Sequence, residues 1–246
     1  MTDHAHYPKA PITEAVIEIR FDGPVSMEKI GSFAKTLKGY PNTRKDVKQN
    51  FELTFNTSEP EAAKALEPVV FGFSCTSEDG KQIVQLREDR FALSRLQPYD
   101  RWETFRAEAQ RLWELCRPQL SEAIKVTRLA VRYINKIDIP LPITDFDDYL
   151  NISPGVDKFA KDGLAEFFIH VLMPQNDINA ALSVNEGMMP VSSDKFISVI
   201  LDLDLFRVVE VPQDDVAIWK YFEVLRARKN QLFEDAVTPK AKELFK

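Results

Sequence analysis

The sequence predicts an α+β fold in which a largely antiparallel sheet carries two long amphipathic helices on its apolar face. Residues 127–140 alternate between apolar and polar side chains, as a half-buried strand does. Residues 101–123 and 214–236 carry apolar residues three and four apart, which is the spacing of a helix stripe. Short apolar runs are separated by turn residues, among them the hairpin signal Asp79-Gly80.

The first elements are expected to be a strand, a short helix and a meander of strands. Residues 13–21 alternate as a strand does, and Ser26 is placed to cap a helix over residues 27–37. The basic stretch from residue 35 to residue 48 predicts a solvated loop after this helix. Four short antiparallel strands then follow, over residues 50–56, 69–77, 82–88 and 91–96.

A long helix is predicted over residues 101–123. Asp100 lies where its N-cap belongs, and Pro118 should kink the last turn or end the helix early. The apolar stripe of this helix consists of Trp102, Phe105, Ala109, Leu112, Trp113, Cys116 and Leu120. We expect this stripe to face the core.

The central strand follows this helix and ends at Pro140. Its apolar face is predicted to hold Leu129, Val131, Tyr133, Ile137 and Ile139, with Asn135 as the exception. The opposite face carries Arg128, Arg132, Lys136 and Asp138. One face of the sheet is therefore expected to be apolar and the other charged.

The second half is expected to repeat the order of the first. A short helix over residues 145–150 precedes strands over 166–173, 178–187 and 195–211. Asp214 then begins a helix whose stripe consists of Val216, Trp219, Phe222, Leu225, Leu232, Phe233 and Ala236. Thr238-Pro239 is expected to cap one further turn.

Both halves run strand, small helix, several strands and long helix. We therefore predict that residues 1–140 and 141–246 are two similar α+β halves of one compact body. The alternative is coincidence within a common arrangement of elements. The connection at residues 140–142 is short and apolar, which argues against freely moving domains.

Composition narrows the class of protein. The 246 residues carry a formal net charge of −6, which makes nucleic acid an unlikely partner, since such a partner needs a basic footprint. No apolar run approaches the ~20 residues that span a bilayer, and the first residues do not form a secretory signal, so no membrane partner is expected. Two distant cysteines fit a reduced, cytoplasmic protein.

Asp202 and Asp204 are the candidate metal ligands. They lie two apart on one predicted strand, so their carboxylates share a face at a spacing of about 7 Å. Paired carboxylates can hold a divalent cation or perform acid–base chemistry. The alternative is a solvated sheet face, or partners for basic side chains on a neighbouring strand.

Arg20, Arg132, Tyr133 and Asn135 are the candidate ligand-binding residues. Together with Lys136 they can form an anion-binding concavity, because arginine matches phosphate and carboxylate geometry. The favoured alternative is a ladder of cross-strand ion pairs, in which the acidic and basic residues of strands 13–21 and 127–140 meet.

Several segments resemble one bacterial protein family of about 250 residues. The matching segments are PITEAVIEIRF (11–21), LQPYDRWETF (96–105), RLAVRYINKIDIP (128–140), ILDLDLF (200–206) and LRARKNQLFEDAVTPKAKELF (225–245). The family is sporadically distributed among bacteria and has no established activity, so the resemblance transfers no catalytic residues. Its distribution implies a mobile or accessory system, such as defence against phage.

No catalytic signature stands out. The chain has only 8 glycines, none in a phosphate-binding loop pattern, and neither cysteine belongs to a recognisable nucleophile motif. The sequence therefore favours a non-enzymatic binding or regulatory module without a cofactor, with a protein partner or a second copy of itself as possible partners. The alternative is a cation-dependent enzyme, or an anion- or nucleotide-binding protein, that uses the charged sheet face.

Overall fold

The computed structural model describes residues 7–49, 51–54, 62–65, 67–121, 123–143, 145–155, 164–190 and 193–246. Within these residues the strands form one nine-stranded antiparallel sheet, with a separate two-stranded hairpin made of β3 and β4. The order across the large sheet is β2-β5-β6-β7-β1-β8-β11-β10-β9. The predicted α+β class, with its antiparallel sheet and two long helices, is confirmed.

The elements have the following bounds. The strands are β1 (Ile12–Asp22), β2 (Asn42–Lys48), β3 (Phe51–Thr54), β4 (Ala62–Ala65), β5 (Val69–Thr76), β6 (Gln82–Arg87), β7 (Arg90–Leu96), β8 (Lys125–Pro140), β9 (Phe168–Gln175), β10 (Ala180–Met188) and β11 (Phe196–Arg207). The helices are α1 (Met27–Thr36), α2 (Trp102–Cys116), α3 (Asp215–Ala236) and α4 (Pro239–Glu243). Short 3₁₀ turns cover Arg117–Gln119, Phe146–Asp148 and Asn176–Ile178.

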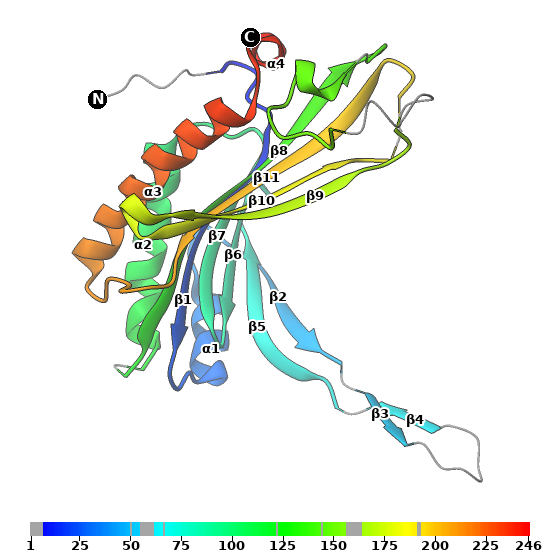
Figure 1. Cartoon of the computed structure of the whole chain (residues 1–246). Coiled ribbons are helices and arrows are strands. Elements are labelled where there is room, and N and C mark those ends of the chain that lie inside the picture. The colour runs from blue at the N-terminus through cyan, green and yellow to red at the C-terminus, as the bar shows by residue number, and fades with distance from the viewer. Residues whose placement is uncertain are drawn as a thin grey trace.

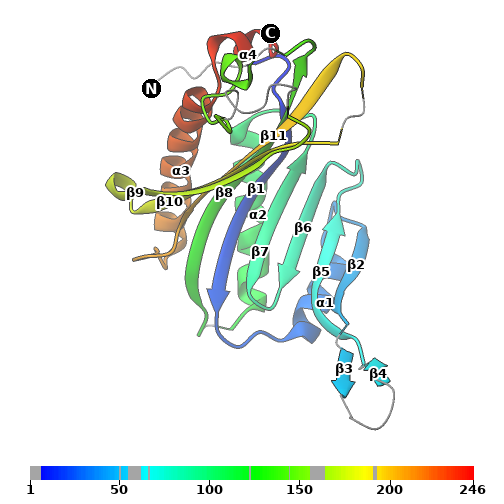
Figure 2. The same ribbon diagram turned by 45° about the vertical axis from the view of Figure 1, so that its right-hand side comes forward.

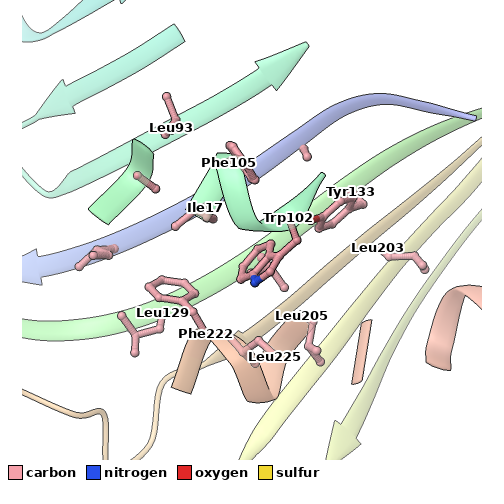
Figure 3. Packing of buried hydrophobic residues seen from close by; sticks show 14 of the residues in the cluster. Ile17, Leu93, Trp102, Phe105, Leu129, Tyr133, Leu203, Leu205, Phe222 and Leu225 are labelled. Carbon is pink, nitrogen blue, oxygen red and sulfur yellow. The ribbon is translucent and has the colours of Figure 1, made fainter. Parts of the chain in front are cut away.

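The helices lie on one face of the sheet, as Figures 1 and 2 show, and among the described elements no helix covers the other face. The covered face is apolar because alternate residues of each strand point to it. Ile17, Val131 and Leu205 are direct neighbours across β1, β8 and β11, and all three are fully buried. Figure 3 shows side chains of this apolar face packed against residues of α2 and α3.

The two long helices run antiparallel to each other, as two tryptophan hydrogen bonds show. Near the start of α2, Trp102 Nε1 donates to Glu223 of α3 at 3.0 Å. Near the end of α2, Trp113 Nε1 donates to Asp215 Oδ1, at the start of α3, at 2.9 Å. Both stripes pack on the core as predicted, with Leu232 and Phe233 partly buried, except that Val216 is 81% exposed. Val216 lies two residues before the buried Ile218, so it points to the opposite side of α3.

Three local expectations need correction. Residues 42–48 form the edge strand β2 rather than a loop. β2 is hydrogen-bonded to β5 along one edge, and a strand at the border of a sheet can form with few apolar residues. The N-cap of α2 is Arg101 rather than Asp100, and no side chain caps it. The helix ends at Cys116, because Pro118 converts the next turn to 3₁₀. Of the strand expected over residues 50–56, residues 50, 55 and 56 lie outside the described part of the chain.

The two halves place their strands in matching order. Reading outward from the centre, one side runs β1, β7, β6, β5 and the other runs β8, β11, β10, β9. By this order β8 begins the second set, whereas the sequence analysis placed it at the end of the first half. The sheet is continuous, since β8 pairs with both β1 and β11. The division into two similar halves stays a prediction.

In the part of the chain that is described, none of the helices combines the length and the apolar composition needed to cross a membrane.

Candidate functional site

Four of the predicted site residues lie on the face of the sheet that no described helix covers: Arg20, Arg132, Asp202 and Asp204. Arg132 of β8 binds Asp202 of β11 with two hydrogen bonds, at 2.8 Å from Nε and 2.6 Å from Nη2. Asn185 of β10 donates to the same carboxylate at 3.1 Å, and His170 of β9 contacts the Asn185 amide at 2.8 Å. Asp202 is therefore a buried acceptor in a chain of polar side chains across four strands.

Arg128 occupies the centre of the same face. It donates to Glu18 of β1 and, at 2.7 Å, to Asp204 of β11. Arg20 donates to Glu18 at 2.8 Å. The Arg128–Glu18 pair joins β8 to β1, as the predicted ladder of cross-strand ion pairs would, whereas Arg20 and Glu18 lie on the same strand. Burial raises the pKa of Asp204, although the neighbouring Arg128 guanidinium opposes that rise.

Asp202 and Asp204, the predicted metal ligands, have no third metal-binding side chain beside them among the described residues. Among the described residues there is no group of three or more His, Cys, Asp or Glu side chains arranged to hold a metal ion. Each of the two carboxylates already accepts hydrogen bonds from a guanidinium group. The metal site stays a prediction, and it requires Arg128 or Arg132 to release its carboxylate.

Tyr133 and Asn135 point to the opposite face, toward the helices, and there they line a cavity of about 260 Å³. We call this cavity the Lys229 pocket. Its walls come from the segment before β1, the start of α2, the middle of β8 and the second half of α3. The lining residues are Tyr7, Ala10, Pro11, Ile12, Tyr99, Asp100, Arg101, Trp102, Glu103, Tyr133, Asn135, Arg226, Lys229, Asn230, Phe233 and Glu234.

The lengths of the two helices create this pocket. α3 has 22 residues and α2 has 15, and the antiparallel pairing places the start of α2 beside Glu223. The remaining turns of α3 therefore extend beyond α2 over the sheet. Arg226, Lys229, Asn230 and Phe233 recur three and four apart, so one face of α3 lines the space that α2 leaves open.

Lys229 is the most unusual group in the pocket. Its side chain is on the apolar stripe of α3, between Leu225 and Leu232, and only 8% of the residue is exposed. Its Nζ lies 3.7 Å from the centre of the Tyr133 ring. This contact is a cation–π interaction, which partly compensates for the water that the ammonium has lost.

The other charged side chains of the lining already have partners. Asp100 pairs with Arg101 at 3.5 Å, Glu103 with Arg226 at 3.3 Å, and Glu234 with Lys242 at 2.9 Å. Within the described residues Lys229 forms no ion pair. Burial, together with the Arg226 charge and against the Glu234 charge, lowers its pKa from 10.5 to about 7.

Two tyrosine hydroxyls accompany the lysine. Tyr99 and Tyr133 are hydrogen-bonded to each other at 3.0 Å. Burial raises the pKa of Tyr99 to about 12 and raises that of Tyr133 well above its usual value. Both hydroxyls therefore stay protonated at neutral pH and can donate or accept hydrogen bonds.

The start of α2 forms part of the same wall. Arg101 at the N-cap makes no side-chain cap, so the first N–H groups of α2 have no capping acceptor from that residue. Arg101, Trp102 and Glu103 all line the pocket. A helix start and a lysine without a carboxylate partner thus face the same space, which favours an anionic ligand.

Lys229, Arg226 and Tyr99 were not among the residues predicted from the sequence. One signal for Lys229 was present: position 229 interrupts the apolar stripe of α3 in the same way that Asn135 interrupts the alternation of β8. Both interruptions line the Lys229 pocket. A third interruption, Glu186 of β10, is fully buried, and both its carboxylate oxygens lack a partner among the described residues. Burial raises the pKa of Glu186 to about 8.

No protein-family model matches the chain and no curated protein matches it, so the family resemblance drawn from the motifs stays a prediction.

Proposed function

We propose that this protein binds a small anionic molecule in the Lys229 pocket and acts as a binding or regulatory module. The observation that carries the proposal is a lysine, nine-tenths buried in a cavity, that has no carboxylate partner among the described residues. Burying a charged group without a partner costs stability, so such a group is retained where a ligand supplies the missing charge.

The size of the cavity limits the ligand. A cavity of about 150 Å³ is enough for a benzene molecule, and drug-sized pockets begin near 300 Å³. The Lys229 pocket, at about 260 Å³, suits a small carboxylate or phosphate compound. Lys229, Asn230 and the start of α2 would receive the anionic group, and the Tyr99–Tyr133 pair would bind a polar atom of the remainder.

A thermal-shift screen tests the proposal. The panel consists of inorganic phosphate, sulfate and short mono- and dicarboxylic acids, measured below and above pH 7. A binder at 100 times its dissociation constant should add about 2.7 kcal/mol to the free energy of unfolding. For a chain of this size that is a rise of roughly 5 to 10 °C in Tm.

Lys229→Met should abolish the shift, and Lys220→Met is the matched control, because Lys220 is an exposed lysine of the same helix. The shift should weaken as the pH rises through 7, since an anion prefers the protonated lysine. A panel without any binder, or an equal shift in the Lys229→Met variant, would refute the proposal.

We also propose that the chain self-associates through the β9 edge of the sheet, because the two edges differ in charge. The β2 edge carries Arg44, Lys45 and Lys48, and such charges protect an edge strand from pairing. The β9 edge carries no Asp, Glu, Lys or Arg, and its Phe168 and Leu172 are 70% and 61% exposed. His170 lies midway between them, so antiparallel pairing about His170 would place the Phe168 of each copy opposite the Leu172 of the other.

Light scattering after size-exclusion chromatography tests this second proposal. A dimer is expected for the wild-type chain and a monomer for Phe168→Asp. Val216→Asp is the control, because Val216 is also an exposed apolar residue but belongs to α3. A wild-type monomer at all accessible concentrations, or a dimer that survives Phe168→Asp, would exclude β9 as the interface.

A reduced, cytoplasmic location remains part of the proposal; Cys75 and Cys116 are both free and buried.

A further inference from the structure

We propose that the anionic ligand of the Lys229 pocket is a carbonyl compound, of the 2-oxo acid class, which forms a reversible imine with the Nζ of Lys229. This inference rests on the proposed function, because it names the chemical class of the ligand. Lysine becomes a nucleophile when an apolar environment removes its charge, and the structure provides such an environment in a cavity with room for a small acid.

The position of the amine fits this chemistry. Its Nζ reaches the pocket over the face of the Tyr133 ring, at 3.7 Å from the ring centre, rather than toward a carboxylate. An amine held by a carboxylate would remain protonated, whereas here burial lowers the pKa of Lys229 to about 7. Near neutral pH a substantial fraction of the lysine therefore has the free electron pair that addition to a carbonyl requires.

The groups that face this amine come from each wall of the pocket. From α3 they are Arg226 and Glu234; from the start of α2 and the residues before it they are Tyr99, Asp100, Arg101 and Glu103; from β8 it is Tyr133; and from the segment before β1 it is Tyr7. The acids among them are already paired with Arg101, Arg226 and Lys242. They add little negative charge that would hold the proton on Lys229.

The two steps balance without an oxidant or a reductant. In the first, the Nζ electron pair adds to the carbonyl carbon, the C=O π bond opens, and a proton passes from nitrogen to oxygen to give a carbinolamine. In the second, the hydroxyl leaves as water after protonation, the nitrogen electron pair forms the C=N bond, and the resulting iminium returns its N–H proton to give the neutral imine. The Tyr99–Tyr133 hydroxyl pair, joined at 3.0 Å, lines the same pocket and would relay the proton in both steps.

The carboxylate of the acid would be held by other groups. Once the imine forms, Lys229 no longer presents an ammonium, so the carboxylate needs Arg226, Asn230 and the N–H groups at the start of α2. Arg226 is already within 3.3 Å of Glu103, and it would have to share its guanidinium between the two carboxylates. The small cavity, at about 260 Å³, suits a short acid whose carbonyl is adjacent to its carboxylate.

The experiment is reductive trapping of the full-length chain. The protein is incubated with pyruvate and cyanoborohydride at pH 7, and lysine modification is mapped by peptide mass spectrometry. The expected product at Lys229 is the secondary amine, and the peptide should gain the mass of the acid less one water plus two hydrogens. Modification of Lys229 should be at least about tenfold faster than that of exposed Lys220 on the same helix.

Controls separate this inference from the proposed function. Lactate has the same carboxylate without the carbonyl, so it should compete with trapping and should not itself be trapped. Modification of Lys229 no faster than that of Lys220 would overturn the imine, and it would leave the binding proposal intact if lactate or pyruvate still shifts Tm in a Lys229-dependent manner. If Lys229 is trapped but no anion shifts Tm, the lysine is reactive without binding an acid in the pocket, and both proposals fail. Because trapping is mapped in the wild-type chain, the test does not depend on the folding of a variant.

Discussion

At the scale of single residues, the tryptophans of the helix layer differ in one hydrogen bond. Trp113 and Trp219 are both buried, and each has an arginine guanidinium over its ring, at 5.5 Å and 5.6 Å. Trp113 Nε1 donates to Asp215, whereas Trp219 Nε1 has no partner among the described residues. Of these two indoles, only that of Trp113 therefore gains stability from a hydrogen bond of its N–H group.

This difference predicts unequal costs for two identical substitutions. Trp113→Phe should cost about 1 to 3 kcal/mol more than Trp219→Phe, because it removes a hydrogen bond and leaves Asp215 with one donor fewer. Urea unfolding of the two variants measures the difference. Equal losses, or a larger loss at position 219, would show that Trp219 has a partner in solution.

Lys229 predicts a pH-dependent gain in stability on substitution. Burial lowers its pKa to about 7 in the folded chain, and the unfolded chain keeps the ordinary value of 10.5. Between these values the unfolded chain binds more protons, so the contribution of Lys229 to the free energy of unfolding becomes more favourable as the pH rises. Its cost to the fold is greatest below pH 7, where the buried lysine is charged.

Lys229→Met should therefore be more stable than the wild type below pH 7, by on the order of 3 kcal/mol, with the gain shrinking toward pH 10.5. Circular dichroism melting curves across this range are the measurement, and Lys220→Met should show no such trend. If the methionine variant is less stable than the wild type at every pH, the lysine is not desolvated as the structure indicates.

At the scale of single elements, the exposed start of α2 connects stability to binding. Arg101 leaves the N-cap without a side-chain acceptor. Arg101→Ser should supply one and stabilise the ligand-free chain by about 0.5 to 1 kcal/mol. The same serine should weaken anion binding, because it occupies N–H groups that the ligand needs. A stability curve and a thermal shift with a ligand of the pocket measure both effects; tighter binding in this variant would show that α2 does not contact the anion.

The elements also show what a sequence can predict. Alternation and helix stripes arise within one segment, so they correctly predicted β8, α2 and α3. The edge strand β2 was missed because its stability depends on the ladder with β5, which is distant in the sequence. Of the two interruptions that line the pocket, only Asn135 was predicted, because it visibly breaks the alternation of β8. Lys229 was not predicted, because it ends the basic run from Arg226 to Lys229, which is typical of a solvated helix face. Only the packing of α3 beyond the start of α2 brings the two together.

At the scale of the whole molecule, one arginine joins the central strands of the sheet. Arg128 of β8 bonds Glu18 of β1 and Asp204 of β11, and all three side chains are largely buried. Glu18 would keep Arg20 and Arg90 if Arg128 were removed, but Asp204 would lose its guanidinium. The loss of one member of a buried ion pair typically costs about 3 to 5 kcal/mol.

Arg128→Met is therefore expected to destabilise the chain by about 3 kcal/mol and to leave unfolding as one cooperative transition. Arg44→Met is the control, since Arg44 is largely exposed and lies 3.8 Å from its partner Asp46; it should change stability by less than about 1 kcal/mol. Two separate transitions in the Arg128 variant would instead mean that the two sets of strands are independent units.

The position of Trp102 has a spectroscopic consequence. Its indole borders the Lys229 pocket, and its Nε1 is bound to Glu223, so its excited state depends on whether the neighbouring space holds water or a solute. The double variant Trp113→Phe/Trp219→Phe would leave Trp102 as the sole tryptophan emitter, because the chain has three. Titration of that variant should then report occupancy of the pocket through a change in emission wavelength, without an attached dye.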